Sequence, residues 1–202
     1  LISLSNGGKD AVVIREFDLA TRRFVDDGFT LPEAKSGVAW VDYNTLLVAT
    51  DWGGNGTTLT QSGYPSTVKR WQRDTPLSEA QQLFSGNKTD VGVFPYTQER
   101  DDGTRLEGVV VAPTFFTREN YVFPTGKDAV RLPLPDKADI VGLFEGQLIF
   151  TIKQDWTVEA AGSTTHYSTG SLLAMPFTEA GEITPETVPE VIFEPNGRQA
   201  IE

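Results

Sequence analysis

The sequence predicts an all-β fold, a partial β-propeller of about three to four blades with four antiparallel strands each, and three observations support this. The 19 Gly and 12 Pro are spread along 202 residues and leave few windows in which a helix could form. Short β-rich runs lie between clusters of turn residues. Groups of four runs begin at Val38, Val91 and Ile140, which are 53 and 49 residues apart. A four-strand repeat of this length is typical of a propeller blade, because one such sheet cannot cover both of its apolar faces alone.

Composition excludes several classes of protein. The 28 acidic and 17 basic residues give a net charge of −11, without a basic run, so we expect no nucleic-acid partner. No stretch approaches the roughly 20 apolar residues of a membrane-spanning helix, and Leu1–Leu4 is too short for the apolar region of a signal peptide, so we expect no membrane partner. The absence of Cys excludes disulfides, zinc–thiolate sites and a thiol nucleophile, and it leaves both a cytoplasmic and a periplasmic location open.

The first complete group of strands opens with a hairpin that turns at Asn44. Its strands are expected at Gly37–Tyr43, Thr45–Trp52, Ser66–Trp71 and Gln82–Ser85. Within Pro76–Phe84 a few apolar residues also fit a helical period, although Gly86 would end such a helix after two turns.

Two further groups repeat this arrangement. The second is expected at Asp90–Tyr96, Glu107–Ala112, Asn120–Phe123 and Ala129–Leu132. The third is expected at Ile140–Phe144, Gln147–Ile152, Gly170–Met175 and Pro189–Phe193. Leu148–Trp156 also matches Leu46–Trp52 with two residues inserted, and we expect both Trp side chains to pack in blade cores.

The ends of the chain predict an incomplete ring. Leu1–Ser5, Val12–Asp18 and Arg23–Val25 read as the last three strands of an earlier blade, and Arg198–Glu202 reads as the start of another. We therefore expect residues 1–202 to be a fragment of one propeller domain, with blades at 1–37 (partial), 38–88, 89–137 and 138–195, followed by the start of the next. Uncovered blade faces would make the isolated fragment self-associate.

Several segments, in this order, resemble one known family. They are Leu4–Ala11, Arg15–Leu19, Phe24–Phe29, Leu46–Asp51, Thr60–Pro65, Val68–Trp71 and Gly170–Ala174. The sequence is similar here to the N-terminal propeller domain of the prolyl oligopeptidase family of serine peptidases, family S9. The resemblance implies a seven-bladed propeller over a C-terminal α/β-hydrolase domain, which would be the partner of this chain. It also implies that the propeller admits short peptide substrates and refuses folded proteins.

The catalytic residues of such an enzyme are not found in this sequence. A Gly-x-Ser-x-Gly elbow is absent, and Ser62-Gly63, Gly162-Ser163 and Gly170-Ser171 each supply only half of one. The single His166 lies in the polar segment Gly162–Ser168, where we expect an exposed loop without a catalytic role. The chain therefore lacks the catalytic triad, which would be supplied by other parts of a serine endopeptidase.

Other kinds of site are weakly represented. Asp101-Asp102-Gly103 could begin a calcium loop, but the further ligands do not follow. Gly53–Gly56 is not followed by the Lys-Ser/Thr of a phosphate loop. Asp51 and Asp155 are the carboxylates that a glycosidase-like propeller would use. We assign no catalytic, cofactor-binding or metal-binding residue, expect no cofactor, and identify no substrate-binding residue.

Three functions remain open at this point. The first is the substrate-gating propeller of a prolyl oligopeptidase-like serine peptidase, with this segment itself non-catalytic. The second is a propeller that serves as a protein-interaction platform without a linked enzyme. The third is a sugar-active propeller that uses Asp51 and Asp155. A Gly-x-Ser-x-Gly elbow further along the full-length protein would favour the first.

Overall fold

The described residues of the chain form an all-β structure, as predicted. The computed structural model describes residues 1–100, 102–103, 105–160, 162–177, 187–197, 199 and 201. Within these ranges the only helical element is the 3₁₀ helix η1 (Leu77–Glu79), and no helix is long and apolar enough to cross a membrane. The weak helical pattern over Pro76–Phe84 thus corresponds to this single turn, and Gln81–Phe84 belongs to a strand. The chain divides into two units, residues 1–96 and 97–202, which are described separately.

The first sheet of unit 1 has the order β1 (Ile2–Leu4), β2 (Val12–Arg15) and β5 (Thr30–Ala34). The prediction that Arg23–Val25 supplies its third strand is wrong, because β4 (Arg23–Phe24) pairs instead with β3 (Phe17–Asp18) in a separate ribbon. Pro32 argues against a strand at β5, yet a proline is tolerated there because β5 is an edge of the described sheet.

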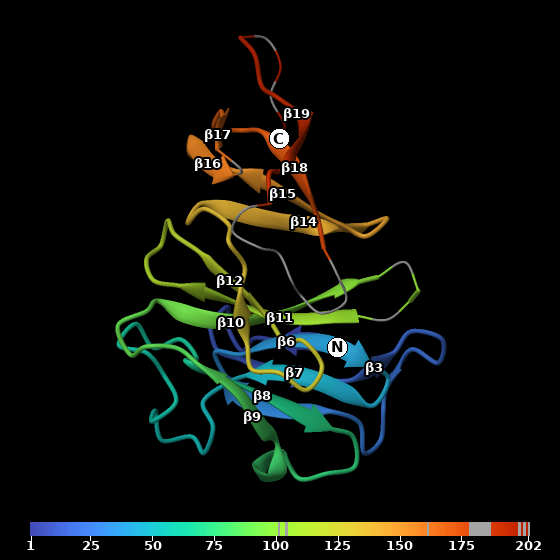
Figure 1. Cartoon of the computed structure of the whole chain (residues 1–202). Coiled ribbons are helices and arrows are strands. Elements are labelled where there is room, and N and C mark those ends of the chain that lie inside the picture. The colour runs from blue at the N-terminus through green and yellow to red at the C-terminus, as the bar shows by residue number, and fades with distance from the viewer. Residues whose placement is uncertain are drawn as a thin grey trace. The chain divides into compact units, whose positions relative to one another are not determined.

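The second sheet of unit 1 contains four antiparallel strands in chain order (Figure 1). They are β6 (Gly37–Asp42), β7 (Thr45–Ala49), β8 (Thr67–Gln72) and β9 (Gln81–Ser85). Every residue of β7 is buried. Leu46 and Val48 of β7 and Trp71 of β8 form one core with Ile14, Phe29 and Leu31, so the two sheets of this unit pack against each other.

Unit 2 contains two further four-stranded antiparallel sheets, the first of which opens with a strand that begins before residue 97. One consists of β10 (Gly92–Glu99), β11 (Arg105–Ala112), β12 (Glu119–Val122) and β13 (Val130–Arg131). The other consists of β14 (Ala138–Phe144), β15 (Gln147–Ile152), β18 (Leu172–Pro176) and β19 (Glu190–Phe193).

A hairpin is inserted between β15 and β18, where a polar loop was expected. The expectation of a loop over Gly162–Ser168 is wrong, because β17 (Ser163–Tyr167) pairs with β16 (Trp156–Ala160). The two strands meet at Gly162, whose φ of 77° suits a tight turn. The alternation of buried Val158 and Ala160 with exposed Thr157 and Glu159 is a strand pattern.

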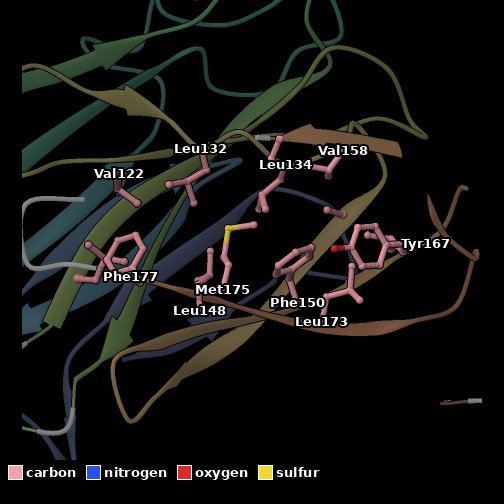
Figure 2. Packing of buried hydrophobic residues seen from close by; sticks show 14 residues of the cluster. Val122, Leu132, Leu134, Leu148, Phe150, Val158, Tyr167, Leu173, Met175 and Phe177 are labelled. Carbon is pink, nitrogen blue, oxygen red and sulfur yellow. The ribbon is translucent and has the colours of Figure 1, made fainter. Parts of the chain in front are cut away.

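The core of unit 2 joins its sheets through large apolar side chains (Figure 2). Leu148, Phe150 and Ile152 lie on alternate positions of β15 and are fully buried. They pack with Leu173 and Met175 of β18 and with Val122 and Leu132 of the neighbouring sheet, while Trp156 packs at the edge of the same core. Trp52 is buried in the core of unit 1, so both Trp side chains serve packing, as expected.

These sheets confirm the predicted fold class. In the described part of the chain, three four-stranded antiparallel sheets follow one another in sequence order, and within each unit the core side chains of one sheet pack on those of another. The blade limits at 37/38, 88/89, 137/138 and 195 stay a prediction. The expected further strand at 198–202 lies largely outside the described residues.

Candidate functional site

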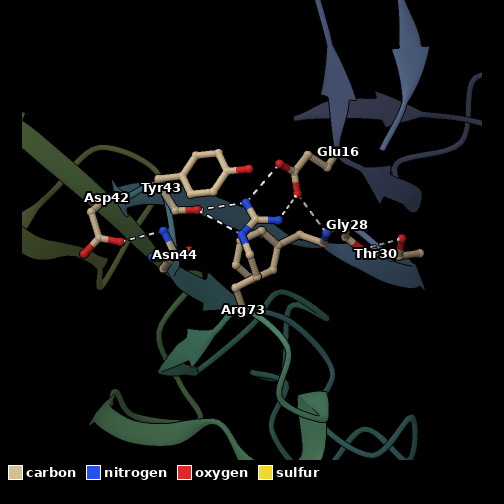
Figure 3. Close-up of polar contacts among 8 residues, drawn as sticks. Glu16, Gly28, Thr30, Asp42, Tyr43, Asn44 and Arg73 are labelled. Atoms are coloured by element: carbon tan, nitrogen blue, oxygen red, sulfur yellow. Dashed lines mark hydrogen bonds and ion pairs between the residues drawn. The ribbon is translucent and has the colours of Figure 1, made fainter. Parts of the chain in front are cut away.

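A charged cluster lies where the two sheets of unit 1 meet (Figure 3). Glu16 follows β2, and Arg73 follows β8. Arg73 donates from Nη1 to Glu16 Oε2 at 2.8 Å and from Nη2 to Glu16 Oε1 at 2.9 Å, which is a bidentate ion pair. The side chains are only 12% and 10% exposed, so the pair is largely removed from water.

Neighbouring groups make the remaining hydrogen bonds of Glu16 and Arg73. Phe29 N donates to Glu16 Oε2 at 3.0 Å, and Arg73 donates from Nε and Nη2 to the backbone oxygen of Tyr43 at 3.2 and 2.8 Å. The guanidinium also lies 4.5 Å from the ring centre of Phe29 and 4.4 Å from that of Tyr43. Gly28 fits closely beside the pair, because a Cβ there would come within 2.9 Å of Glu16 Oε2. The cluster links the first sheet to the second.

The electrostatics of the cluster favour a structural role. The hydrogen bonds from Arg73 lower the pKa of Glu16 below its ordinary value of 4.5, although burial acts in the opposite direction. The same contact raises the pKa of Arg73. Both groups therefore stay charged at neutral pH, and neither is suited to donate or accept a proton in catalysis.

Asp51 lies beside a cavity of about 590 Å³ in unit 1, where it serves the fold of its own loop. Pro32, Trp52 and Leu59 line this cavity. Both carboxylate oxygens of Asp51 accept from Gly56 N, at 3.0 and 3.1 Å, which holds the glycine-rich loop closed. Because that N–H is already engaged, the loop is not arranged as a phosphate cradle.

Asp155 performs the same task in unit 2. Its Oδ1 accepts from Thr169 N at 2.8 Å and thereby ties together the two ends of the β16–β17 insertion. Each of the two aspartates predicted for a sugar-active site thus caps a loop of its own unit. Loop capping accounts for the positions of both carboxylates, so no catalytic role is needed to explain them.

The three serines that each supply half of a Gly-x-Ser-x-Gly motif have ordinary structural surroundings. Ser62 is exposed in the loop between β7 and β8, and Ser163 begins β17. Ser171 is buried, and its hydroxyl donates to the backbone oxygen of Ser168 at 2.8 Å. His166 is exposed on β17, and its Nδ1 lies 2.8 Å from Thr157 Oγ1. The side chain that contacts His166 Nδ1 is thus Thr157, not one of these serines.

No metal site is found among the described residues, since none of their acidic and His side chains gather in a group of three. The calcium-loop candidate is only partly described, because Asp101 and Thr104 lie outside those ranges.

The Glu16–Arg73 pair was not found from the sequence. Its members are 57 positions apart, so no local pattern joins them. Glu16 does fall in Arg15–Leu19, one of the segments that carry the family resemblance, which was the available signal.

Comparison with known proteins points to one family. The model of the prolyl oligopeptidase N-terminal β-propeller domain matches residues 1–177. The uncharacterized peptidase y4nA of Sinorhizobium fredii is 38% identical over 210 residues, which cover all of this chain and 28% of that protein. The uncharacterized peptidase RP174 of Rickettsia prowazekii is 27% identical over 191 residues, covering 89% of this chain and 26% of that protein.

Solved structures agree with this. A post-proline cleaving enzyme from Rickettsia typhi superposes with a TM-score of 0.82 at 25% identity, over 96% of this chain and 29% of that enzyme. A chain from a study of two prolyl endopeptidases gives a TM-score of 0.54 at 19% identity, over 87% of this chain and 29% of that chain, and shows the shared fold. This chain spans between a quarter and a third of these proteins. It belongs to the prolyl oligopeptidase family, and its residues form part of the N-terminal β-propeller domain.

Proposed function

We propose that this chain is part of a propeller that controls access of peptides to the active site of a serine peptidase. The observation that carries the proposal is the likeness to a post-proline cleaving enzyme over 96% of the chain. In the full-length protein the triad would come from a C-terminal α/β-hydrolase domain, and the substrates would be short peptides cleaved after proline. The propeller would exclude folded proteins and bulk water from that site.

The geometry of the described residues supports a non-catalytic role for this segment. Asp51, Asp155 and Ser171 are engaged in local loop contacts, and His166 contacts Thr157 on the surface of a hairpin. The two relatives are named peptidases and extend far beyond the matched region, which favours a linked enzyme over a free-standing interaction platform.

The test uses the full-length protein and a short chromogenic peptide with proline before the scissile bond. We expect cleavage of this peptide, its loss after treatment with a serine-directed fluorophosphonate, and no cleavage of the same sequence placed inside a stably folded protein. His166→Ala is the control, because an exposed residue outside the triad should leave kcat/KM unchanged. Absence of cleavage, or its persistence after the inhibitor, would reject the proposal.

A further inference from the structure

Three Asn-Gly pairs occur in the chain, at Asn6-Gly7, Asn55-Gly56 and Asn196-Gly197. An asparagine before glycine can lose its side-chain amide without an enzyme, because glycine has no Cβ to shield the backbone nitrogen that attacks the side chain. The third pair borders residue 198, which lies outside the described residues, so we compare the first two. Both lie in exposed loops, and exposure alone would therefore make them equally reactive.

The reaction sets two conditions on the structure. The glycine backbone nitrogen loses its proton and bonds to Cγ of the preceding asparagine, while the Cγ–Nδ2 bond breaks and the amide nitrogen leaves as ammonia. Water then opens the succinimide ring at either carbonyl, which leaves aspartate or isoaspartate. The backbone N–H must therefore be able to lose its proton, and the asparagine side chain must be free to turn toward that nitrogen.

Neither condition is met at Asn55. Gly56 N donates to both carboxylate oxygens of Asp51, at 3.0 and 3.1 Å. A negative charge held against this N–H disfavours loss of its proton. The side-chain oxygen of Asn55 accepts from Thr57 N at 3.1 Å and from Thr57 Oγ1 at 2.7 Å. The amide is thus held by the residue beyond Gly56.

The backbone around Asn55 is fixed as well. Leu59 N donates to Gly56 O at 3.2 Å. Lys88 Nζ donates to the backbone oxygens of Thr57 and Leu59, the latter at 2.7 Å. A loop held at several points resists the backbone rotation that closure of the succinimide ring requires.

The turn at Asn6 lacks these restraints. Asn6 and Gly7 are exposed, and a Cβ at Gly7 would meet no atom within 4 Å. Among the described residues, neither the Asn6 side chain nor the backbone nitrogen of Gly7 makes a hydrogen bond. Ser5 Oγ donates to Lys9 O at 2.8 Å across the turn and leaves that nitrogen open to water.

We propose that Asn6 is a site of spontaneous deamidation and that Asp51 protects Asn55 from the same reaction. The product at Asn6 places a new negative charge in the turn between β1 and β2. In the isoaspartate form it also adds a methylene group to the backbone. The inference is independent of the proposed function, because it concerns only the chemistry of two loops.

Peptide mapping of the full-length protein tests the difference between the two sites. The protein is incubated in mildly alkaline buffer, and mass spectrometry with electron-transfer fragmentation follows aspartate and isoaspartate at each position. We expect Asn6 to react at least roughly tenfold faster than Asn55, the factor expected when a charge-assisted hydrogen bond must break before reaction. In urea the two sites should react at similar rates. Equal rates in the folded protein, or no reaction at Asn6, would overturn the proposal.

Substitution of Asp51 tests the protection directly. Asp51→Ala should raise the rate at Asn55 roughly tenfold and leave the rate at Asn6 unchanged. Asp51→Asn keeps a hydrogen-bond acceptor without the charge and should give an intermediate rate, which provides the measurement if Asp51→Ala does not fold. Asp155→Ala is the matched control, because Asp155 caps a loop of unit 2, and it should change neither rate. An unchanged rate at Asn55 in both Asp51 variants would reject the protective role.

Discussion

Arg73 shows how one side chain can join two sheets. Its planar guanidinium donates to Glu16 in a bidentate manner, donates to Tyr43 O, and lies between two aromatic rings. A lysine offers neither the fork of donors nor the flat face, so it cannot replace these contacts. The ion pair stabilises the fold only when both partners are present, because each side chain is largely buried.

Removal of Arg73 alone should therefore be costly. We expect Arg73→Met to lower the free energy of unfolding by about 3 kcal/mol, since it leaves the Glu16 carboxylate buried without its cation. The double variant Glu16→Leu with Arg73→Met should lower the free energy of unfolding much less. Urea unfolding of the full-length proteins measures both, and a loss of less than about 1 kcal/mol in the single variant would contradict the role given to the pair.

The same pair predicts a dependence on pH. Because the pKa of Glu16 in the folded protein lies below its ordinary value of 4.5, the carboxylate stabilises the fold above that value. This stabilisation is lost as the pH falls through the lowered pKa. The difference in unfolding free energy between the native protein and Glu16→Gln should be full at pH 7 and shrink in acid. A difference that stays constant down to pH values below the lowered pKa would show that the charge of Glu16 does not matter.

Strand β15 carries the largest fully buried side chain among the described residues. Phe150 is fully buried between the sheets, whereas Phe144 on the adjacent β14 is 63% exposed. The two phenylalanines thus offer a matched pair on paired strands.

Phe150→Ala should destabilise the protein by about 3–5 kcal/mol, because it removes buried apolar surface and leaves a cavity. Phe144→Ala should change the stability of residues 1–202 by less than about 0.5 kcal/mol in either direction, because its side chain is 63% exposed there. Thermal and urea unfolding of the two variants compare them directly. Similar losses in both variants of residues 1–202 would contradict the exposure of Phe144.

The strands also show what the sequence reveals and what it hides. The β6–β7 hairpin was predictable because apolar runs flank a turn at Asn44, and the repeat near 50 residues located the later sheets. Strand β5 was missed because Pro32 is a poor strand former away from an edge, and β17 was missed because its Ser-Thr-Thr-His run is polar. Glu16 and Arg73 meet only after two sheets have packed, so local pattern could not pair them.

For the molecule as a whole, the last sheet leaves several large apolar side chains exposed in residues 1–202 taken alone. They are Val141, Phe144, Val191 and Ile192. Exposed apolar groups in this number favour association in water.

The isolated fragment should accordingly form dimers or larger assemblies, whose size increases with concentration. Multi-angle light scattering of residues 1–202 measures this, and the full-length protein under the same conditions is the comparison. A monodisperse monomer at all concentrations would contradict the prediction.

The β16–β17 hairpin indicates where the chain can accept an insertion. Gln147–Thr151 of β15 pairs in continuous register with Leu172–Pro176, even though an entire ribbon departs and returns between these strands. Asp155 fastens the base of this ribbon through a hydrogen bond from Thr169 N, and the exposed Gly162 lies at its turn. Because Val158, Ala160 and Tyr167 of the ribbon are buried in the core of unit 2, deletion of the whole ribbon should destabilise the fold. An epitope or fluorescent reporter grafted at the exposed Gly162 should leave the parent sheet intact.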